Sequence, residues 1–384
     1  MNDIFSEIRP FRPEELQDVY TQLFAEQGFH HVLDFLYPNI GHADIEKRMR
    51  QCATSLEFQR NFCVEFLDGV LARSGKGIEM DSSSIDLNKR YTFMSNHRDI
   101  VLDSAFLSYL LLKNGCDTTT EIGIGDNLLI YPWIKLLVRV NKSFIVRRGL
   151  SLRETLMSSK LMSEYMHHAI VEKNENLWIA QREGRSKDSS DLTQASVLKM
   201  MAMGGSGSLK ERLTEMHICP LTISYEYDPC DWLKAREYQQ RRDDDSYHKQ
   251  PVDDLLNMQT GIFGYKGHIH YHCAPCIDDF IGSLPDDMPK QEFFERVAEF
   301  ITHEIHSHYY LYPCNYIADD MLNSRKQHMG VNYTEEEANQ FNDYLSRQIE
   351  RIELENKDEA FLRERMLTMY ANPLRNSRLT TQNS

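Results

Sequence analysis

The segment YTFMSNHRDIVLDSAFLSYLLLK, residues 91–113, decides the fold of this chain. Residues 91–95 are typical of a short strand, and residues 102–113 are typical of a helix. The segment also carries His97, followed by the carboxylates Asp99 and Asp103. An imidazole close to a carboxylate suits a general base whose orientation is fixed by an acid. The sequence therefore places a candidate reaction centre where a strand gives way to a helix.

Strand-like and helix-like runs alternate downstream of this segment. Such alternation is typical of an α/β sheet. We therefore predict an α/β fold in which helices flank a mixed central sheet. The further strand-like runs are residues 143–146, 176–180, 219–227 and a stretch near Ile269, and the further helix-like runs are residues 152–168, 192–203, 291–310 and 334–354.

Three parts of the chain are expected from these patterns. Residues 1–85 carry clustered apolar positions and form a helical N-terminal region, and residues 86–320 form the α/β domain. Residues 321–384 form a helical C-terminal extension, whose polar tail is expected to fray from Asn372. The acidic stretch 241–254 is expected to be a solvated loop or insertion.

Composition and charge limit the partners. A hydrophobic share of 41% and a charged share of 26% indicate a soluble globular protein. The net charge of −15 argues against nucleic acid as a partner, because nucleic-acid binding rewards spread-out Lys and Arg. Residues 135–160 are locally basic, however, and an anionic small substrate or headgroup would be attracted there.

Membrane contact is expected to be peripheral. The apolar stretches 106–112 and 128–140 are too short or too interrupted to span a bilayer. Residues 128–140, with Trp133 among apolar and basic residues, suit either a membrane interface or a core helix interrupted by Pro132. The eight cysteines follow no export segment and indicate reduced intracellular thiols.

Two further segments supply candidate binding residues. Arg147 and Arg148 end a strand-like run, and a guanidinium pair suits a phosphorylated ligand. Glu183, Gly184 and Arg185 form a polar turn after another strand-like run, where glycine permits a positive φ. Glu183 either contacts the substrate or only pairs with Arg185.

A zinc site is the alternative that the sequence leaves open. His268, His270 and His272 alternate along a predicted strand, and Cys273 and Cys276 have a metal-like spacing. No second ligand set sits at a typical distance, so we interpret this run as structural and predict no metal site.

In order and approximate spacing, four segments between residues 91 and 226 resemble the blocks of the glycerolipid acyltransferase superfamily. This superfamily includes glycerol-3-phosphate and 1-acylglycerol-3-phosphate (lysophosphatidate) acyltransferases. Asn-His-Arg resembles the first block, Phe-Ile-Val-Arg-Arg the second, Glu-Gly-Arg-Ser the third and Pro-Leu-Thr-Ile-Ser-Tyr-Glu the fourth. The paired arginines and the Tyr-Glu look closer to the glycerol-3-phosphate branch.

One spacing departs from the family pattern. The family normally has four residues between His and Asp, whereas five separate His97 from Asp103. Either the turn absorbs one residue, or Asp99 takes the orienting role. We favour Asp103, because the apolar run after Asp99 would place it one turn into a helix.

The resemblance implies direct acyl transfer by the central domain. His97 would take the proton of an acceptor hydroxyl as the hydroxyl attacks the thioester of acyl-CoA or an acyl carrier protein. Asp103 would stabilise the resulting imidazolium. The resemblance implies no cofactor besides this acyl co-substrate, and it places the protein in the cytoplasm, peripheral on the cytoplasmic face of a membrane.

The acceptor implied by the resemblance is glycerol 3-phosphate or a lysophospholipid such as lysophosphatidate. Arg147, Arg148 and Arg185 would neutralise its phosphate, and Glu183 and Gly184 would shape its site. Two alternatives stay open at this point: a catalytically inactive lipid-binding relative, and an acyltransferase for a lyso-aminolipid.

Overall fold

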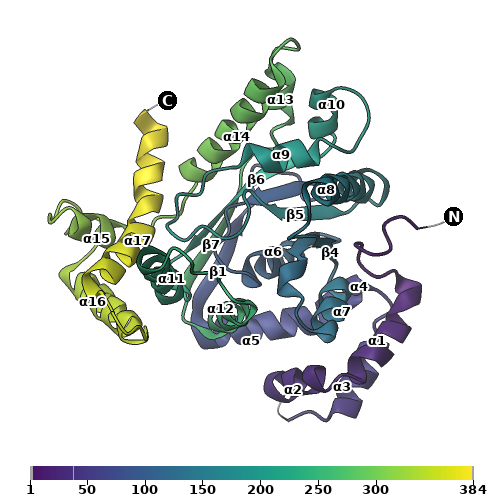
Figure 1. Cartoon of the computed structure of the whole chain (residues 1–384), viewed down its shortest axis with the longest axis horizontal. Coiled ribbons are helices and arrows are strands. Elements are labelled where there is room, and N and C mark those ends of the chain that lie inside the picture. Colours follow the sequence, from purple (N-terminus) through teal and green to yellow (C-terminus); the bar gives the residue numbers. More distant parts are fainter. Residues whose placement is uncertain (1–2, 38, 383–384) are drawn as a thin grey trace.

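The computed structural model describes residues 3–37 and 39–382 and is built around a seven-stranded sheet (Figure 1). The strand order is β1-β7-β6-β2-β5-β3-β4. Strands β6, β2, β5, β3 and β4 are parallel to one another, whereas β7 is antiparallel to β6 and parallel to β1. The predicted mixed α/β sheet is thereby confirmed. The strands are β1 Gly75–Asp81, β2 Thr92–Ser95, β3 Thr120–Gly125, β4 Ser143–Val146, β5 Asn176–Ala180, β6 Ile218–Tyr225 and β7 Gly267–Cys273.

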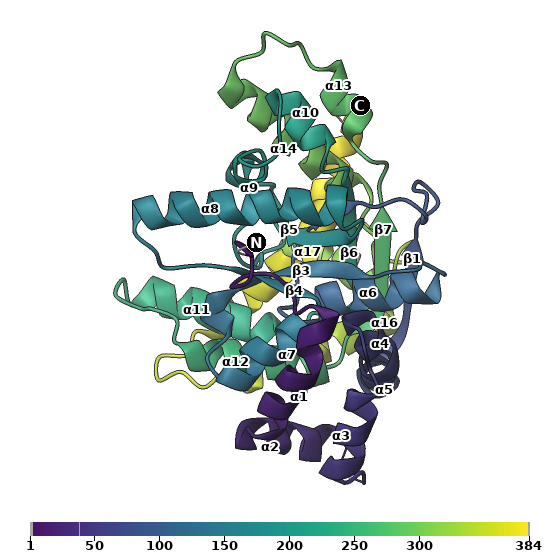
Figure 2. The same ribbon diagram turned by 90° about the vertical axis from the view of Figure 1, so that its right-hand side faces the viewer.

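Helices cover both faces of the sheet, and both terminal regions of the chain are helical (Figure 2). The α-helices are α1 Leu16–Phe24, α2 Gln27–Leu36, α3 His42–Arg50, α4 Ser55–Phe58, α5 Val64–Ser74, α6 Leu102–Lys113, α7 Pro132–Val140, α8 Leu152–His167, α9 Ala195–Met201, α10 Leu209–Thr214, α11 Asp231–Asp243, α12 Pro251–Phe263, α13 Asp278–Ser283, α14 Lys290–Ser307, α15 Pro313–Leu322, α16 Glu335–Glu350 and α17 Glu359–Gln382. Short 3₁₀ or π turns are η1 Pro13–Glu15, η2 Gln59–Cys63, η3 Asp126–Leu128 and η4 His168–Glu172.

Four apolar clusters hold these layers together. One cluster packs α8, α9, α13 and α14 on one face of the sheet, and a second packs α5 and α6 on the other. A third cluster joins α11 to α15, α16 and α17, and a fourth joins α1 to α4 with α7. The central strands β2 and β6 are buried throughout, and their small polar residues Thr92, Ser95, Thr222 and Ser224 are buried among the apolar ones.

Two strands were not predicted from the sequence. Strand β1 lies within the region expected to be helical, and its Lys76, Glu79 and Asp81 give it the polar character of an edge strand. Strand β3 contains Gly123 and Gly125, which weaken the strand signal. The division of the chain near residues 85 and 320 stays a prediction, although β1 joins the first part to the sheet.

The C-terminal tail is helical where fraying was expected. Helix α17 continues past Asn372 to residue 382. Asn372 Nδ2 donates to the Asp188 carbonyl at 2.6 Å, and Asn376 Nδ2 donates to the Ser189 carbonyl at 2.9 Å. Leu374 is buried beside them. These contacts dock the tail onto the loop that follows β5.

The stretch 128–140 is largely half-buried: its end at Arg139 and Val140 is buried, whereas Ile130 and Tyr131 are exposed. Pro132 begins α7 at its first turn and does not interrupt it. Val140 is buried and Trp133 partly buried in the cluster of the N-terminal helices. In the same basic region, Arg139 and Lys142 are buried, and Arg139 Nε donates to the Arg9 carbonyl at 2.8 Å. Among the described residues, no helix is long and apolar enough to cross a membrane.

Stability is expected to depend on pH through Asp231, which is fully buried at the start of α11. Its carboxylate accepts hydrogen bonds from Tyr344 and Tyr370 at 2.8 Å and from Gln348 at 2.6 Å. Burial nevertheless raises its pKa to about 7. The folded state therefore holds this proton more tightly than the unfolded state does, so the free energy of unfolding should fall as pH rises from about 4 to about 7.

Urea unfolding of the wild type and of Asp231→Asn across this pH range measures the effect. The variant should lose the part of the pH dependence that the wild type owes to Asp231, whereas the control Asp245→Asn should keep it. Parallel curves for the wild type and Asp231→Asn would exclude this role.

Candidate active site

His97 and Asp103 are in direct contact in the turn between β2 and α6. His97 Nδ1 lies 2.8 Å from Asp103 Oδ2. The Asp103 side chain is fully buried, and the same oxygen accepts the backbone N–H groups of Arg98 at 2.6 Å and Asp99 at 3.0 Å. The turn thus accommodates all five intervening residues, and Asp103 is the carboxylate that meets the imidazole.

Asp99 has a different place in the turn. Its Oδ1 accepts the backbone N–H groups of Val101 at 2.9 Å and Leu102 at 2.8 Å, which satisfies donors at the start of α6. Its Oδ2 is buried without a hydrogen-bond partner among the described residues. Burial, followed by the nearby Asp103 carboxylate, raises the pKa of Asp99. Asp99 therefore supports the turn rather than the imidazole.

Helix α12 closes over Asp99 through Gly261. A Cβ atom at this position would lie 1.9 Å from Asp99 Oδ2. Gly261→Ala is therefore expected to destabilise the protein by about 1–3 kcal/mol, because α12 must move away from the turn. Urea unfolding measures this cost. Gly282→Ala is the matched control, since a Cβ there meets nothing within 4 Å, and equal stability of both variants would contradict the proposed contact.

The geometry around His97 leaves its second ring nitrogen available for chemistry. When Nδ1–H donates to Asp103, the Nε2 lone pair can accept a proton. The ring packs edge-on against Trp178, with centroids 5.3 Å apart. Trp178 Nε1–H in turn donates a hydrogen bond to Ser95 Oγ at 3.1 Å. The imidazole is therefore fixed on one side by a carboxylate and on another by an aromatic ring.

A cavity of about 1330 Å³ adjoins His97. The predicted site residues Arg147, Arg148, Glu183, Gly184 and Arg185 also line it. Asp103 does not line it, because it lies behind the imidazole. The structure thus brings residues from three sequence segments to one cavity. Much of the remaining wall is apolar and comes from α2, α5, α6, α7 and α12.

The predicted arginines differ in their surroundings. Arg147 is exposed at the end of β4. Arg148 pairs with Glu183, so Glu183 pairs with an arginine of the other segment and not with Arg185. Arg185 Nη2 donates to Asn257 Oδ1 at 2.8 Å. Gly184 has a φ of +68°, the left-handed conformation that glycine adopts readily.

The turn after β5 adds Arg182, which sequence reasoning missed although it stands next to Glu183. Arg182 lines the same cavity. Arg148 Nε, Arg182 Nε and Arg185 Nη1 are buried and have no hydrogen-bond acceptor within the described part of the chain. Buried N–H groups are normally paired, so these three favour an anionic ligand in the cavity.

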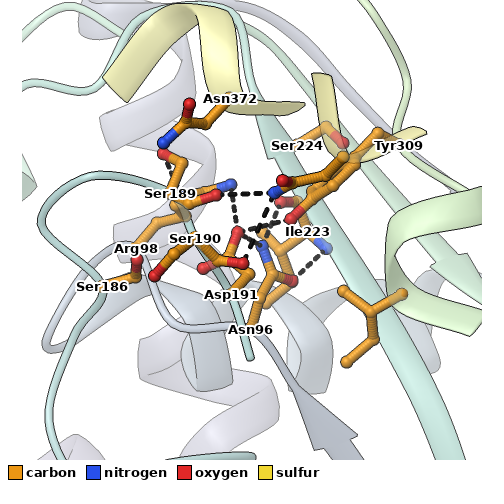
Figure 3. Close-up of polar contacts among 12 residues, drawn as sticks. Asn96, Arg98, Ser186, Ser189, Ser190, Asp191, Ile223, Ser224, Tyr309 and Asn372 are labelled. Atoms are coloured by element: carbon orange, nitrogen blue, oxygen red, sulfur yellow. Dashed lines mark hydrogen bonds and ion pairs between the residues drawn. The ribbon is translucent and has the colours of Figure 1, made fainter. Parts of the chain in front are cut away.

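The residues on either side of His97 are clamped by a buried network (Figure 3). Asn96 exchanges two hydrogen bonds with the backbone of Ile223 in β6, at 2.8 and 2.9 Å. Arg98 Nη2 lies 2.6 Å from Asp191 Oδ2, and Tyr309 donates to the same oxygen at 2.5 Å. Asp191 and Asn96 are fully buried. Strand β6, the loop after β5 and Tyr309 just after α14 therefore jointly hold the His97 turn.

The suggested zinc ligands of β7 do not converge. His268, His270 and His272 alternate with buried residues, whereas Cys273 shares the opposite face of the strand. Among the described residues, two other groups have metal-like ligand atoms within 4.8 Å of one another: His217 with Cys276 and Asp278, and Asp319 with Asp320 and His328.

Neither group lies at the cavity. His217 precedes β6 at the opposite end of the strands from His97. Asp319 is already paired with the guanidiniums of Arg325, Arg375 and Arg378. The absence of a metal from the reaction site stays a prediction.

No protein-family model matches the chain, and no curated protein matches its sequence. Among solved structures, the chain is similar to the 1-acyl-sn-glycerophosphate (LPA) acyltransferase PlsC from Thermotoga maritima. The two share 10% sequence identity, and the match covers 76% of this chain and 95% of that one, with a TM-score of 0.37. A similarity this weak carries no argument about function, which therefore rests on the geometry of the site.

Proposed function

We propose that this protein is an O-acyltransferase that moves a fatty acyl group from acyl-CoA or an acyl carrier protein to a hydroxyl of glycerol 3-phosphate or lysophosphatidate. One observation carries the proposal: His97, paired with a buried carboxylate, faces a large, mainly apolar cavity that several arginines also line. A general base, an anion site and room for a hydrocarbon chain are the parts that this transfer needs.

His97 is the proposed general base. Its Nε2 takes the proton of the acceptor hydroxyl as the hydroxyl oxygen attacks the thioester carbonyl carbon. The carbon–sulfur bond then breaks, and the imidazolium returns the proton to the departing thiolate. Asp103 stabilises the imidazolium through the 2.8 Å contact at Nδ1. The acyl group passes directly to the acceptor, with no acyl-enzyme and no further cofactor.

The arginines are the proposed phosphate site. Arg147, Arg148, Arg182 and Arg185 line the cavity that His97 faces, and three of them carry buried N–H groups without an acceptor in the described chain. A phosphate bound there would hold the acceptor hydroxyl near Nε2 and convert binding energy into orientation. Glu183 would hold Arg148 until the phosphate arrives.

The apolar part of the cavity is the proposed place of the acyl chain. Phe29 and Leu33 of α2 and Phe62 line it, together with Leu67 of α5 and Leu137 of α7. The N-terminal helices therefore contribute directly to the proposed site. We place the reaction at the cytoplasmic face of a membrane, where the lipid acceptor or product resides.

A panel of acceptors tests this function. Each acceptor is incubated with one acyl-CoA and, separately, with one acyl carrier protein, and the new ester is measured by mass spectrometry. We expect activity with glycerol 3-phosphate or lysophosphatidate, and little with glycerol or monoacylglycerol. Activity confined to unphosphorylated acceptors or to a lyso-aminolipid would contradict the role of the arginines.

Arg148→Ala should weaken binding of the phosphorylated acceptor. Loss of one charge-assisted hydrogen-bond partner is expected to raise the KM for that acceptor about 10-fold or more. The side chain is half-exposed, so the fold should survive. Initial rates at varied acceptor concentration measure the effect, with the surface variant Arg296→Ala as control. An unchanged KM would remove Arg148 from the phosphate site.

A further inference from the structure

The amino-terminal half of α8 carries large apolar side chains that nothing covers. Leu152 is 93% exposed, and Leu156 and Met157 are each 63% exposed. All residues from 151 to 157 are exposed, and α8 extends past the edge of the sheet (Figure 2). Single exposed apolar residues are common on protein surfaces, but three on adjacent turns of one helix mark an interaction site.

The other face of the same helix belongs to the cavity. Thr155, Ser158, Ser159 and Met162 line it at the spacing of one helical face. With 3.6 residues per turn, Leu156 and Met157 then point away from the cavity, whereas Leu152, seven positions before Ser159, lies at the border between the two faces. Helix α8 is therefore a wall between the cavity and the exposed apolar face.

Basic side chains accompany this apolar face. Arg153 and Lys160 are exposed on the same side of α8, and the exposed Arg147 precedes the helix. Two acidic residues lie nearby. Lys160 Nζ lies 3.7 Å from the Glu164 carboxylate, and the Glu154 carboxylate accepts a hydrogen bond from the Ser151 hydroxyl at the start of α8. Local positive charge beside apolar side chains is unusual on a protein of net charge −15. This combination fits an anionic bilayer surface, where apolar side chains enter the interface and cations meet the headgroups.

We propose that the face of α8 formed by Leu152, Arg153, Leu156, Met157 and Lys160 docks the protein on a bilayer that contains anionic lipid. The proposal rests on the proposed function, since the bilayer would hold the lipid acceptor or product. It also differs from the interfacial alternative that the sequence left open, which was residues 128–140. Trp133, Leu136 and Leu137 of that segment pack against the N-terminal helices, and its exposed Ile130 and Tyr131 are less exposed than Leu152, Leu156 and Met157 of α8.

Vesicle flotation tests the docking face without any substrate. The full chain is mixed with vesicles of phosphatidylcholine alone or of phosphatidylcholine with phosphatidylglycerol. We expect the wild type to float with the mixed vesicles and to dissociate as salt rises. The triple variant Leu152→Ser, Leu156→Ser, Met157→Ser should lower the partition coefficient about 10-fold or more. The double variant Arg153→Glu, Lys160→Glu should lower the partition coefficient by about 5-fold for each substituted residue, and only on the mixed vesicles.

A matched triple variant controls for the loss of exposed apolar surface. Ile4, Val331 and Leu379 are 63%, 84% and 57% exposed and lie elsewhere in the chain. Changing these three to serine should leave flotation unchanged. Circular dichroism checks that both triple variants stay folded, which is expected because every changed side chain is exposed.

Several outcomes would overturn the docking face. They are recovery of the wild type only in the soluble fraction, and flotation of both triple variants to the same extent as the wild type. If sedimentation showed that the wild type self-associates through this face and that the α8 triple variant does not, the occupant would be a second copy of the chain. Transfer from a short-chain acyl-CoA to glycerol 3-phosphate needs no bilayer, so activity without flotation rejects only the docking face, and flotation without activity rejects only the proposed function.

Discussion

Replacing His97 by alanine is expected to lower the kcat of acyl transfer about 10²–10⁴-fold, the range typical of a general base. The physical reason is the position of the imidazole, whose Nδ1 is held by Asp103 while the ring lines the cavity. Without it, no group described at this position can take the hydroxyl proton with the same geometry. Single-turnover release of thiol from acyl-CoA in the presence of acceptor measures the loss.

The loss of activity in His97→Ala is interpretable only if the variant is folded and if removal of another histidine leaves the activity unchanged. The His97 side chain is 13% exposed and makes one hydrogen bond within the described part of the chain, so the variant should remain folded. His268→Ala removes an exposed histidine outside the cavity and should keep full activity. If His97→Ala transferred acyl groups at the wild-type rate, His97 would have no part in the mechanism.

Replacing Asp191 by alanine is expected to lower the free energy of unfolding by about 3–5 kcal/mol. Asp191 is fully buried and pairs with the buried guanidinium of Arg98 at 2.6 Å. Removal of the carboxylate leaves that positive charge in the interior without its partner. Tyr309 loses its acceptor at the same time. Denaturation by guanidinium chloride, followed by circular dichroism, measures the cost.

The loop that carries Asp191 also supplies the control. Asp188 is half-buried, and within the described part of the chain its side chain accepts hydrogen bonds from Ser186 and Ser190 of its own loop. Asp188→Ala should therefore cost clearly less than Asp191→Ala. Equal costs for the two variants would mean that the Arg98 pair does not stabilise the turn next to His97.

The sequence predicts those elements whose signal is local. Strands β4 and β5 and helix α6 were predicted with the boundaries that the structure has, because each is a compact apolar run. The edge strand β1 and the glycine-containing β3 gave no such run. The tail of α17 was expected to fray from Asn372, because its sequence is polar. The amide contacts that hold it reach a loop nearly two hundred residues away in the chain, so no local signal could reveal them.

In the candidate site, too, the sequence predicts local contacts and misses contacts between distant parts of the chain. His97 and Asp103 lie within one turn, so their pairing could be proposed from the sequence alone. Asp191 could not, since nothing local to it indicates that it will pair with Arg98 across 93 positions of the chain. The pairing of Glu183 with Arg148 likewise needs two strands of the sheet to be placed.

The most direct test of the proposed acyl transfer is to follow thiol release and ester formation together in the purified protein. The protein is given acyl-CoA or acyl-loaded carrier protein, with and without glycerol 3-phosphate or lysophosphatidate. The proposed mechanism predicts that thiol appears only with the acceptor and in equal amount to the new ester, and that His97→Ala abolishes both. Thiol release at the same rate without acceptor, or no ester with either donor and either acceptor, would contradict it.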